Sequence, residues 1–195
     1  MNLVAIILAA GFGKRVASLG SKPLLRCGGK TFVELIVEKL LRVNNHSIII
    51  VTNRTLDEKI RNLKLPARIV INPNPERGML SSLVCGIKIV PNMASGIVMN
   101  PVDFPLVKTA TYQEMKKLHE QNSNHIIKPV YQGKSGHPVI FPQNLFAALE
   151  DAPLDQGARF VVRKFSHLIK TMDTSDQGIV LNINTPEMYK KWCVN

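Results

Sequence analysis

Three short segments of the chain carry residue types that could act on a polyphosphate. The first is the glycine-rich loop after the apolar run Leu3–Leu8, which contains Ala9, Ala10, Gly11 and Gly13 and then the cations Lys14, Arg15 and Lys22. Small residues let backbone N–H groups approach an anion closely, while Arg15 offers a planar fork for phosphate oxygens and Lys22 a compact charge. The loop predicts an anion site, although an ordinary strand-to-helix turn with surface cations would use the same residues.

Two common phosphate-binding patterns are absent from this loop. Position 16 is Val16, so the third glycine of the dinucleotide pattern G-x-G-x-x-G is missing. The pair Gly13-Lys14 is followed by Arg15 and has no glycine five positions before it, which excludes the P-loop. The anion site therefore needs another explanation.

The second segment is a lone acid, Asp103, directly after the apolar strand expected at Gly96–Met99. In open parallel sheets the ligand crevice lies at the carboxyl ends of the strands, so Asp103 should share a crevice with the first loop. A carboxylate facing a polyphosphate suits Mg²⁺, which takes few protein oxygens and keeps substrate oxygens and waters. An Asp beside Pro101 and Pro105 that only caps a turn is the alternative.

The third segment is Gly136-His137-Pro138, and a lone histidine beside proline is more often structural than catalytic. The other histidines form no H-E-x-x-H pair, so a zinc hydrolase is not indicated. There is no G-x-S-x-G either, which argues against a serine hydrolase.

Strands that alternate with helices over the first hundred residues predict a parallel sheet with helices on both faces. Strands are expected at Leu3–Leu8, His46–Thr52, Arg68–Ile71, Gly96–Met99, His125–Val130, Val139–Phe141, Leu168–Met172 and Ile179–Leu181. Helices are expected at Thr31–Val43, Leu56–Leu63, Met79–Val90, Thr111–Glu120, Leu145–Glu150, Ala158–Phe165 and Pro186–Trp192. The shorter strands after Val130 should extend the same sheet, which predicts one domain over residues 1–195.

Composition limits the function classes. A chain of 195 residues with 45% hydrophobic and 20% charged residues is typical of a globular protein, and a net charge of +11 favours anionic partners. The cations are scattered and aromatics are only 6%, so no nucleic-acid partner is expected. No apolar run approaches the roughly 18 residues that span a bilayer, and Cys27, Cys85 and Cys193 are widely spaced. We therefore expect no membrane contact, no disulfide framework and a cytoplasmic location.

Several short motifs, taken together, resemble a known enzyme family. They are Leu8-Ala9-Ala10-Gly11 with Arg15, Lys22 with Leu24-Leu25, Gly78-Met79 with Ser82-Leu83 and Gly86, Pro101-Val102-Asp103 with Pro105, Gly136-His137-Pro138-Val139 with Phe141, and Asn182-Ile183-Asn184-Thr185-Pro186 with Tyr189. In this order, over nearly the whole chain, they resemble the MobA-like NTP transferase family, in particular its molybdenum cofactor cytidylyltransferase branch. The resemblance implies a three-layer, Rossmann-like α/β nucleotidyltransferase fold of the nucleotide-diphospho-sugar transferase type, with a mostly parallel sheet.

The resemblance also assigns roles to residues. It implies that Leu8, Ala9, Ala10, Gly11 and Arg15 hold the nucleotide, that Lys22 contacts the reacting phosphate, that Ser82 lies near base and ribose, that Asp103 holds Mg²⁺, and that Gly136 and His137 face the acceptor. Arg15, Lys22 and Asp103 would be the catalytic set. The guanylyl-transferring branch usually reads LAGG where this chain has Ala10, which favours CTP.

The chain departs from the family pattern at two places. The insert Val16–Ser21 replaces the usual Met-Gly after the arginine, which changes the reach of Lys22. The family usually reads D-I-D-T-P near the end, and this chain has Asn182 and Asn184 in place of both acids. An amide oxygen still ligates Mg²⁺ but brings no charge, so these two ligands should bind the metal more weakly.

The resemblance implies transfer of CMP from CTP to the phosphate of molybdopterin with release of pyrophosphate, and a molybdenum hydroxylase as a partner protein. Two alternatives stay open. The first is a nucleotidyltransferase for another phosphorylated acceptor, such as a sugar or alcohol phosphate. The second is a nucleotide- or cofactor-binding accessory protein of molybdenum enzymes with little turnover.

Overall fold

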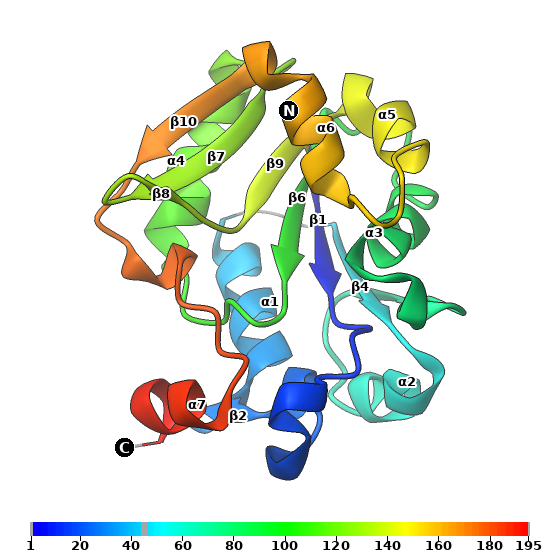
Figure 1. The fold of residues 1–195 in the computed structure, drawn as a ribbon, viewed down its shortest axis with the longest axis vertical. Helices are drawn as coiled ribbons and strands as arrows, with labels where there is room; N and C mark the ends of the chain where they lie inside the picture. Colours follow the sequence, from blue (N-terminus) through cyan, green and yellow to red (C-terminus); the bar gives the residue numbers. More distant parts are fainter. Residues whose placement is uncertain (1, 44–46, 195) are drawn as a thin grey trace.

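A central sheet with helices on both faces forms the molecule (Figure 1). The computed structural model describes residues 2–43 and 47–194, apart from the side chains of Lys14, Arg15 and Ala17. The strands lie in the order β10-β7-β9-β6-β1-β4-β5, and β8 pairs with the end of β7 at Val130 and Tyr131. This arrangement confirms the predicted three-layer α/β fold with a mostly parallel sheet.

The central-sheet strands from the first half of the chain pair with one another in parallel. The strands are β1 (Leu3–Leu8), β4 (Ile48–Thr52), β5 (Arg68–Ile71), β6 (Gly96–Pro101), β7 (Ile126–Tyr131), β8 (Lys134–Ser135), β9 (Val139–Pro142) and β10 (Ile169–Asp173). β1 pairs in parallel with β4 and β6, and β9 runs antiparallel between β6 and β7. In this register Leu8 lies opposite both Val51 and Pro101, so three strands end at one edge.

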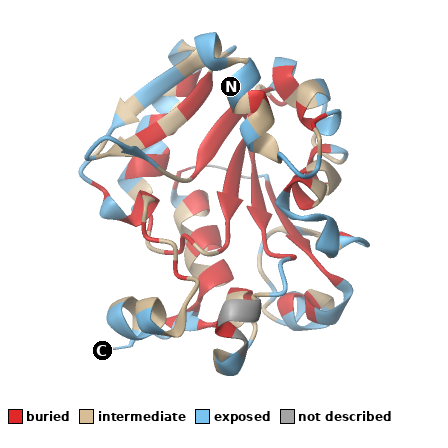
Figure 2. Ribbon diagram, viewed as in Figure 1, coloured by how far each residue is buried: buried red, intermediate tan, exposed pale blue. Residues whose placement is uncertain are grey.

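The two faces of β1 face two separate hydrophobic clusters, which explains its unbroken apolar sequence. Leu3, Ala5 and Ile7 pack on one side and Val4, Ile6 and Leu8 on the other. The first side is covered by α1 (Phe32–Arg42), α2 (Arg54–Arg61), α4 (Thr109–Gln121) and α7 (Pro186–Cys193), and the second by α3 (Met79–Ile87), α5 (Phe146–Glu150) and α6 (Ala158–Lys164). Figure 2 shows β1, β4 and β6 buried along their whole length.

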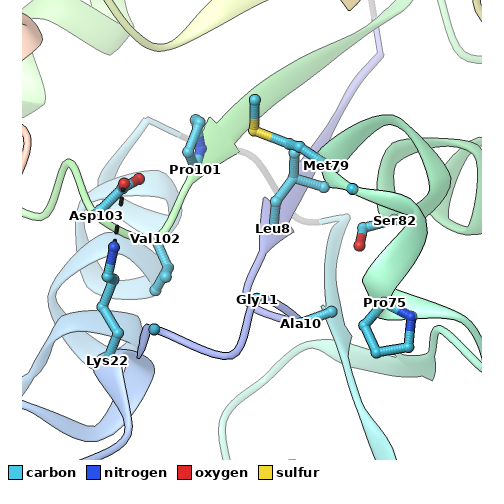
Figure 3. A pocket seen from close by; sticks show the side chains of 12 residues that line it. Leu8, Ala10, Gly11, Lys22, Pro75, Met79, Ser82, Pro101, Val102 and Asp103 are labelled. Atoms are coloured by element: carbon cyan, nitrogen blue, oxygen red, sulfur yellow. Dashed lines mark hydrogen bonds and ion pairs between the residues drawn. The ribbon is translucent and has the colours of Figure 1, made fainter. Parts of the chain in front are cut away.

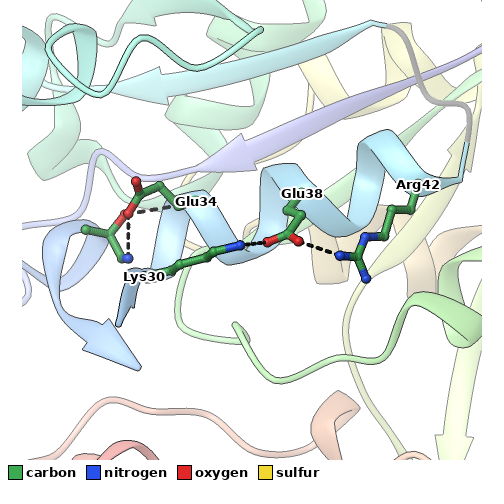
Figure 4. A network of polar contacts seen from close by, with 5 residues as sticks. Lys30, Glu34, Glu38 and Arg42 are labelled. Carbon is green, nitrogen blue, oxygen red and sulfur yellow. Dashed lines mark hydrogen bonds and ion pairs between the residues drawn. The ribbon is translucent and has the colours of Figure 1, made fainter. Parts of the chain in front are cut away.

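Helix α1 shows how local sequence fixes an element. The Thr31 hydroxyl accepts from the Glu34 N–H, and Glu34 accepts from the Thr31 N–H, which closes a capping box. On its exposed side Glu38 pairs with Lys30 and Arg42 (Figure 4). Such surface pairs contribute little stability because solvent screens them, so the buried face led by Phe32 and Ile36 determines the position of the helix.

Several short elements were not predicted. They are the 3₁₀ turns η1 (Lys14–Leu19), η2 (Lys22–Leu24), η3 (Pro75–Arg77), η4 (Gln143–Leu145) and η5 (Ser166–Leu168), and the hairpin of β2 (Arg26–Cys27) and β3 (Lys30–Thr31). The hairpin turns at Gly28 and Gly29, whose φ angles of +57° and +82° suit a tight two-residue turn. Its buried Cys27 donates to the Trp192 carbonyl, so the hairpin packs against α7.

The predicted strand at Ile179–Leu181 is wrong. The chain forms a 3₁₀ turn there, η6 (Gln177–Ile179), because the Asp176 carboxylate accepts from the Gly178 N–H and the N–H groups of Val180 and Leu181 bond back to Gln177 and Gly178. The other predicted elements are present with ends that differ by a few residues, and His46 lies outside the described residues. None of the described helices is long and apolar enough to cross a bilayer.

Candidate active site

A cavity of about 180 Å³ opens at the carboxyl ends of β1 and β6 (Figure 3). We call it the first cavity. It is lined by Leu8, Ala10, Gly11, Gly13, Lys22, Pro75, Gly78, Met79, Ser82, Pro101, Val102 and Asp103. Six of the predicted site residues are therefore in one place: Leu8, Ala10, Gly11, Lys22, Ser82 and Asp103.

The loop after β1 is held from behind. The Ala9 N–H donates to the Val51 carbonyl at 2.8 Å, and the Asn53 side-chain amide donates to the Ala10 carbonyl at 2.8 Å. Ala9 is fully buried and does not line the first cavity, so its contribution is to fix the loop. A Cβ added at Gly11 would meet no described atom within 4 Å, which leaves room for a ligand to approach the backbone.

A polar network holds the turn that carries Asp103. The Tyr112 hydroxyl donates to Asn100 Oδ1 at 2.6 Å, and Asn100 Nδ2 donates to the Pro101 carbonyl at 2.9 Å. The Val102 N–H donates to the Leu8 carbonyl at 3.2 Å, which ties this turn to the end of β1. Burial raises the pKa of Tyr112, so its hydroxyl stays a donor.

Lys22 and Asp103 form the charged side of the first cavity. Lys22 Nζ lies 3.4 Å from Asp103 Oδ2, and the two side chains keep 13% and 19% of their surface exposed. A phosphate could therefore reach Lys22, and a metal ion could reach Asp103. Figure 3 shows this pair on one side of the first cavity, with Ser82 and Pro75 on the opposite side.

A second cavity of about 530 Å³ lies beside the first, and Met79 lines both. Its floor is apolar, with Leu80, Leu83, Met99, Val139, Phe141 and Val162. Its polar lining includes Lys128, Ser135, His137, Asp155, Gln156 and Arg159, and Gly136 also lines it. The second cavity can therefore take a ligand that is larger and less polar than the first cavity can hold.

His137 is a half-buried, neutral wall of the second cavity. Burial lowers the pKa of His137 to about 4, partly offset by the nearby Asp103 carboxylate. Its ring centroid lies 4.7 Å from that of Phe104, and no hydrogen-bond partner of its Nδ1 atom is found within the described part of the chain. The imidazole is therefore uncharged near neutral pH and cannot act there as a proton donor of ordinary strength.

Gly136 is required by backbone packing. A Cβ at this position would lie 2.2 Å from the Ile179 carbonyl oxygen, and the next N–H, that of His137, donates to the same oxygen at 2.9 Å. The segment before α7 is thereby fixed against the second cavity.

Asn182 and Asn184 line neither cavity, but their segment touches the Asp103 turn. The Ile183 N–H donates to the Asp103 carbonyl at 2.8 Å. The side-chain oxygen of Asn182 is buried, and no described group donates to it. Among the described residues no cluster of three or more His, Cys, Asp or Glu side chains could hold a metal. A metal here would rely on Asp103, the unpaired Asn182 oxygen and substrate oxygens, a set that suits Mg²⁺.

Comparison with known proteins gives this geometry a context. Residues 5–171 match the MobA-like NTP transferase domain. The chain belongs to this family. Structures similar to this MobA-like NTP transferase include Rv0371c of Mycobacterium tuberculosis H37Rv, with a TM-score of 0.87, 22% identity and coverage of 100% of this chain and 98% of that one. Rv0371c is also known as a manganese complex.

Two further proteins are similar to this chain, one in structure and one in sequence. Molybdopterin-guanine dinucleotide biosynthesis protein A of Archaeoglobus fulgidus aligns with a TM-score of 0.70 and 17% identity over 97% of this chain and 96% of that one. The bifunctional protein GlmU of Thermoanaerobacter pseudethanolicus is 26% identical over 155 residues, 77% of this chain and 34% of that protein. The chain thus spans about a third of the length of that curated relative. These similarities support the fold, and they leave the substrates open.

Several lining residues of this MobA-like NTP transferase were not predicted as site residues. Gly78, Met79, Pro101 and Val102 belong to the motifs that carried the resemblance, and their positions beside Ser82 and Asp103 were a usable signal. Lys128, a cation inside an apolar strand, was another. Arg159 gave none, because only the packing of α6 brings it to the second cavity. The Arg15 side chain lies outside the described residues.

Proposed function

We propose that this MobA-like NTP transferase transfers CMP from CTP to the phosphate of molybdopterin and releases pyrophosphate. The observation that carries the proposal is the junction of the two cavities at Met79. The charged first cavity suits a nucleoside triphosphate. The larger, mostly apolar second cavity suits an acceptor with a planar ring system.

The reaction needs positioning more than proton transfer. A phosphomonoester is mostly dianionic at pH 7, since its second pKa is about 6, so an oxygen of the acceptor phosphate attacks the α-phosphorus without a general base. The new O–P bond forms while the α–β bridge bond breaks, and the electron pair leaves with pyrophosphate. A neutral His137 at the acceptor side is compatible with this reaction.

The residues of the first cavity would reduce the repulsion between anions. Lys22 would contact the reacting phosphate, backbone N–H groups near Gly11 would approach the triphosphate, and Arg15 would lie near its β- and γ-phosphates. Asp103 with Asn182 would hold Mg²⁺. When bound, Mg²⁺ neutralises phosphate charge and stabilises the leaving group.

The second cavity would hold the acceptor. Its apolar floor would cover a ring face, while Lys128 and Arg159 would attract anionic groups. The product would then pass to a molybdenum hydroxylase.

Two candidates compete with this proposal. Ser135, Asp155 and Gln156 could bond the hydroxyls of a sugar or alcohol phosphate, which favours a nucleotidyltransferase for another acceptor. A metal site with one carboxylate, itself paired with Lys22, favours an accessory protein with little turnover.

Thermal unfolding with CTP, GTP, ATP and UTP, each with and without Mg²⁺, is the first test. We expect the largest rise in melting temperature with CTP plus Mg²⁺. Stabilisation that ignores Mg²⁺ would favour the accessory protein, and no stabilisation by any nucleotide would refute the nucleotide site.

The acceptor is tested by pyrophosphate release with molybdopterin. Arg159→Ala should raise the KM for the acceptor and leave the KM for CTP unchanged, whereas Arg68→Ala, an exposed arginine on β5, should change neither. Release with sugar or alcohol phosphates only would replace molybdopterin as the acceptor.

A further inference from the structure

A buried amide, Asn72, lies behind the wall of the first cavity that is opposite Lys22 and Asp103. It follows β5 directly and keeps only 1% of its surface exposed. Its N–H donates to the Thr52 carbonyl at 2.7 Å, which continues the pairing of β4 with β5. Asn72 does not line the first cavity, so its influence on a ligand must act through a neighbour.

Hydrogen bonds fix which way the Asn72 amide points. Its Oδ1 accepts from the Asn74 backbone N–H at 2.9 Å, and an N–H can donate only to the oxygen. Its Nδ2 therefore points the other way and donates to the hydroxyl oxygens of Ser81 and Ser82, at 2.9 Å each. Both hydrogens of the amide are used.

The two serines then differ in what their hydroxyl hydrogens can do. Ser81 donates to the Gly78 carbonyl at 2.8 Å and does not line the first cavity. Ser82 lines that cavity, and within the described ranges 2–43 and 47–194 no group accepts from its hydroxyl. The Ser82 oxygen accepts from Asn72, and its hydrogen has no acceptor among these residues, so that hydrogen is left for a ligand.

The position of Ser82 suggests which part of a nucleotide it meets. Figure 3 shows Ser82 and Pro75 across the first cavity from the Lys22–Asp103 pair. If phosphates lie at the charged side, the base lies at the Ser82 side. We infer that Asn72 is a positioning residue that makes Ser82 a hydrogen-bond donor to the base, so that the site prefers cytosine to uracil. The inference rests on the proposed function.

The chemistry of the two pyrimidines explains the preference. Cytosine N3 carries a lone pair and accepts a hydrogen bond, whereas uracil N3 carries a hydrogen and donates one. A Ser82 hydroxyl that donates toward N3 thus pairs with cytosine. With uracil the hydroxyl must turn to accept from the N3 hydrogen on its second lone pair, which leaves its own hydrogen without an acceptor. Leaving a buried polar group unpaired in this way lowers affinity by about tenfold or more.

Asn72→Asp is the decisive variant because it reverses the polarity with little change in shape. The carboxylate would accept from the Asn74 N–H and from the Ser82 hydroxyl, so Ser82 would turn its hydrogen toward that carboxylate and offer a lone pair to the base. We expect the ratio of the Kd values for UTP and CTP, measured by calorimetry, to fall by about tenfold or more. If the role of Asn72 were purely structural, Asn72→Asp would weaken the binding of CTP and UTP equally and leave the ratio of their Kd values unchanged.

Two further variants complete the test. Ser81→Ala removes the other partner of Asn72 and should keep the wild-type ratio. Ser82→Ala should fold, because alanine is a good helix former and Ser82 lies in α3. It should bring the ratio of the Kd values for UTP and CTP toward one. An unchanged ratio in both Asn72→Asp and Ser82→Ala would overturn the inference while leaving the proposed function intact. A wild-type protein that binds neither nucleotide would instead overturn the proposed function.

Discussion

Lys22 Nζ and Asp103 Oδ2 lie 3.4 Å apart although 81 residues separate them in the sequence. The pair forms because the loop after β1 and the turn after β6 leave the sheet at the same edge. In the proposed reaction the two groups serve different partners, Lys22 a phosphate and Asp103 a cation. Substrate binding would therefore replace their mutual contact with stronger ones, and either variant of the pair should affect turnover more than stability.

Asp103→Asn is the direct test of the catalytic assignment. Loss of the charge should raise the barrier by about 2.7–4 kcal/mol, a fall in kcat of about 10²- to 10³-fold, since one preorganised electrostatic contact is lost. Asp103→Ala should abolish pyrophosphate release in the presence of Mg²⁺. The melting temperature should change little, because the side chain is 19% exposed and its ion pair is weak.

The matched control is Asp173→Asn, which makes the same chemical change at an exposed position on β10. It should keep wild-type turnover. Full activity of Asp103→Ala would contradict the assignment of Asp103 as a catalytic residue.

Asn182→Asp should strengthen metal binding in the absence of nucleotide. The Asn182 oxygen is buried, and nothing donates to it in the described part of the chain, so a carboxylate there would add charge beside Asp103. Because ligand charge tunes the affinity of carboxylate sites, the Kd for Mn²⁺ should fall by about tenfold. Electron paramagnetic resonance of free Mn²⁺ measures this without turnover.

Asn124→Asp, at an exposed position, should leave the Kd for Mn²⁺ unchanged. If Asn182→Asp binds Mn²⁺ no better than the wild type, Asn182 is not a ligand and the second protein oxygen comes from elsewhere.

Two glycines of the site should respond in opposite ways to alanine. Gly136→Ala would place a Cβ 2.2 Å from the Ile179 carbonyl oxygen, so the free energy of unfolding should fall by about 3 kcal/mol or more. The methyl of Gly11→Ala would meet none of the described atoms within 4 Å, so this variant should fold normally, but the methyl would stand where the phosphates approach. The Kd of this variant for CTP should rise by about tenfold.

Urea denaturation and calorimetry separate the two effects. A Gly136→Ala protein as stable as the wild type would mean that this segment can shift, and unchanged CTP affinity in Gly11→Ala would remove Gly11 from the nucleotide site.

The fold and the charged side of the site were predictable because they depend on local pattern and on one rule of topology. Leu3–Leu8 and Ile48–Thr52 are unbroken apolar runs, which indicate central parallel strands, and parallel strands end at one edge. That rule was enough to bring Asp103 to the loop of Gly11 and Lys22. Gly136 and His137 were predicted on the acceptor side and line the second cavity, but no sequence pattern indicated its Arg159 side, because α6 reaches it only through tertiary packing.

The error at Ile179–Leu181 has a related cause. Its apolar residues suggested a strand, but Ile179 enters the hydrophobic core from a turn, and Gly178 packs so closely that a Cβ there would lie 2.4 Å from the Leu106 carbonyl oxygen. Asp176 completes this arrangement by accepting from the Lys108 N–H and the Thr111 hydroxyl at the start of α4. Apolar residues are equally compatible with a buried turn, and only the distant partners of Asp176 decide between the two.

The half-buried His137 should make stability depend on pH in a defined direction. Its pKa is lowered from the ordinary 6.5 to about 4 by burial, so between these values the unfolded chain binds a proton that the folded protein does not. Stability from this group is therefore complete above pH 6.5 and is lost as pH falls toward 4. The loss should reach about 3 kcal/mol at most, since one pKa unit corresponds to about 1.4 kcal/mol.

Urea denaturation of the wild type and of His137→Gln at pH 7 and pH 4.5 checks this. The difference between the two proteins should change in favour of His137→Gln as pH falls, and this comparison cancels the contribution of His119, whose pKa burial also lowers. His167→Gln, at an exposed position, should follow the wild type at both pH values. Parallel curves for wild type and His137→Gln would mean that the imidazole gains a proton in the folded state as easily as in the unfolded one.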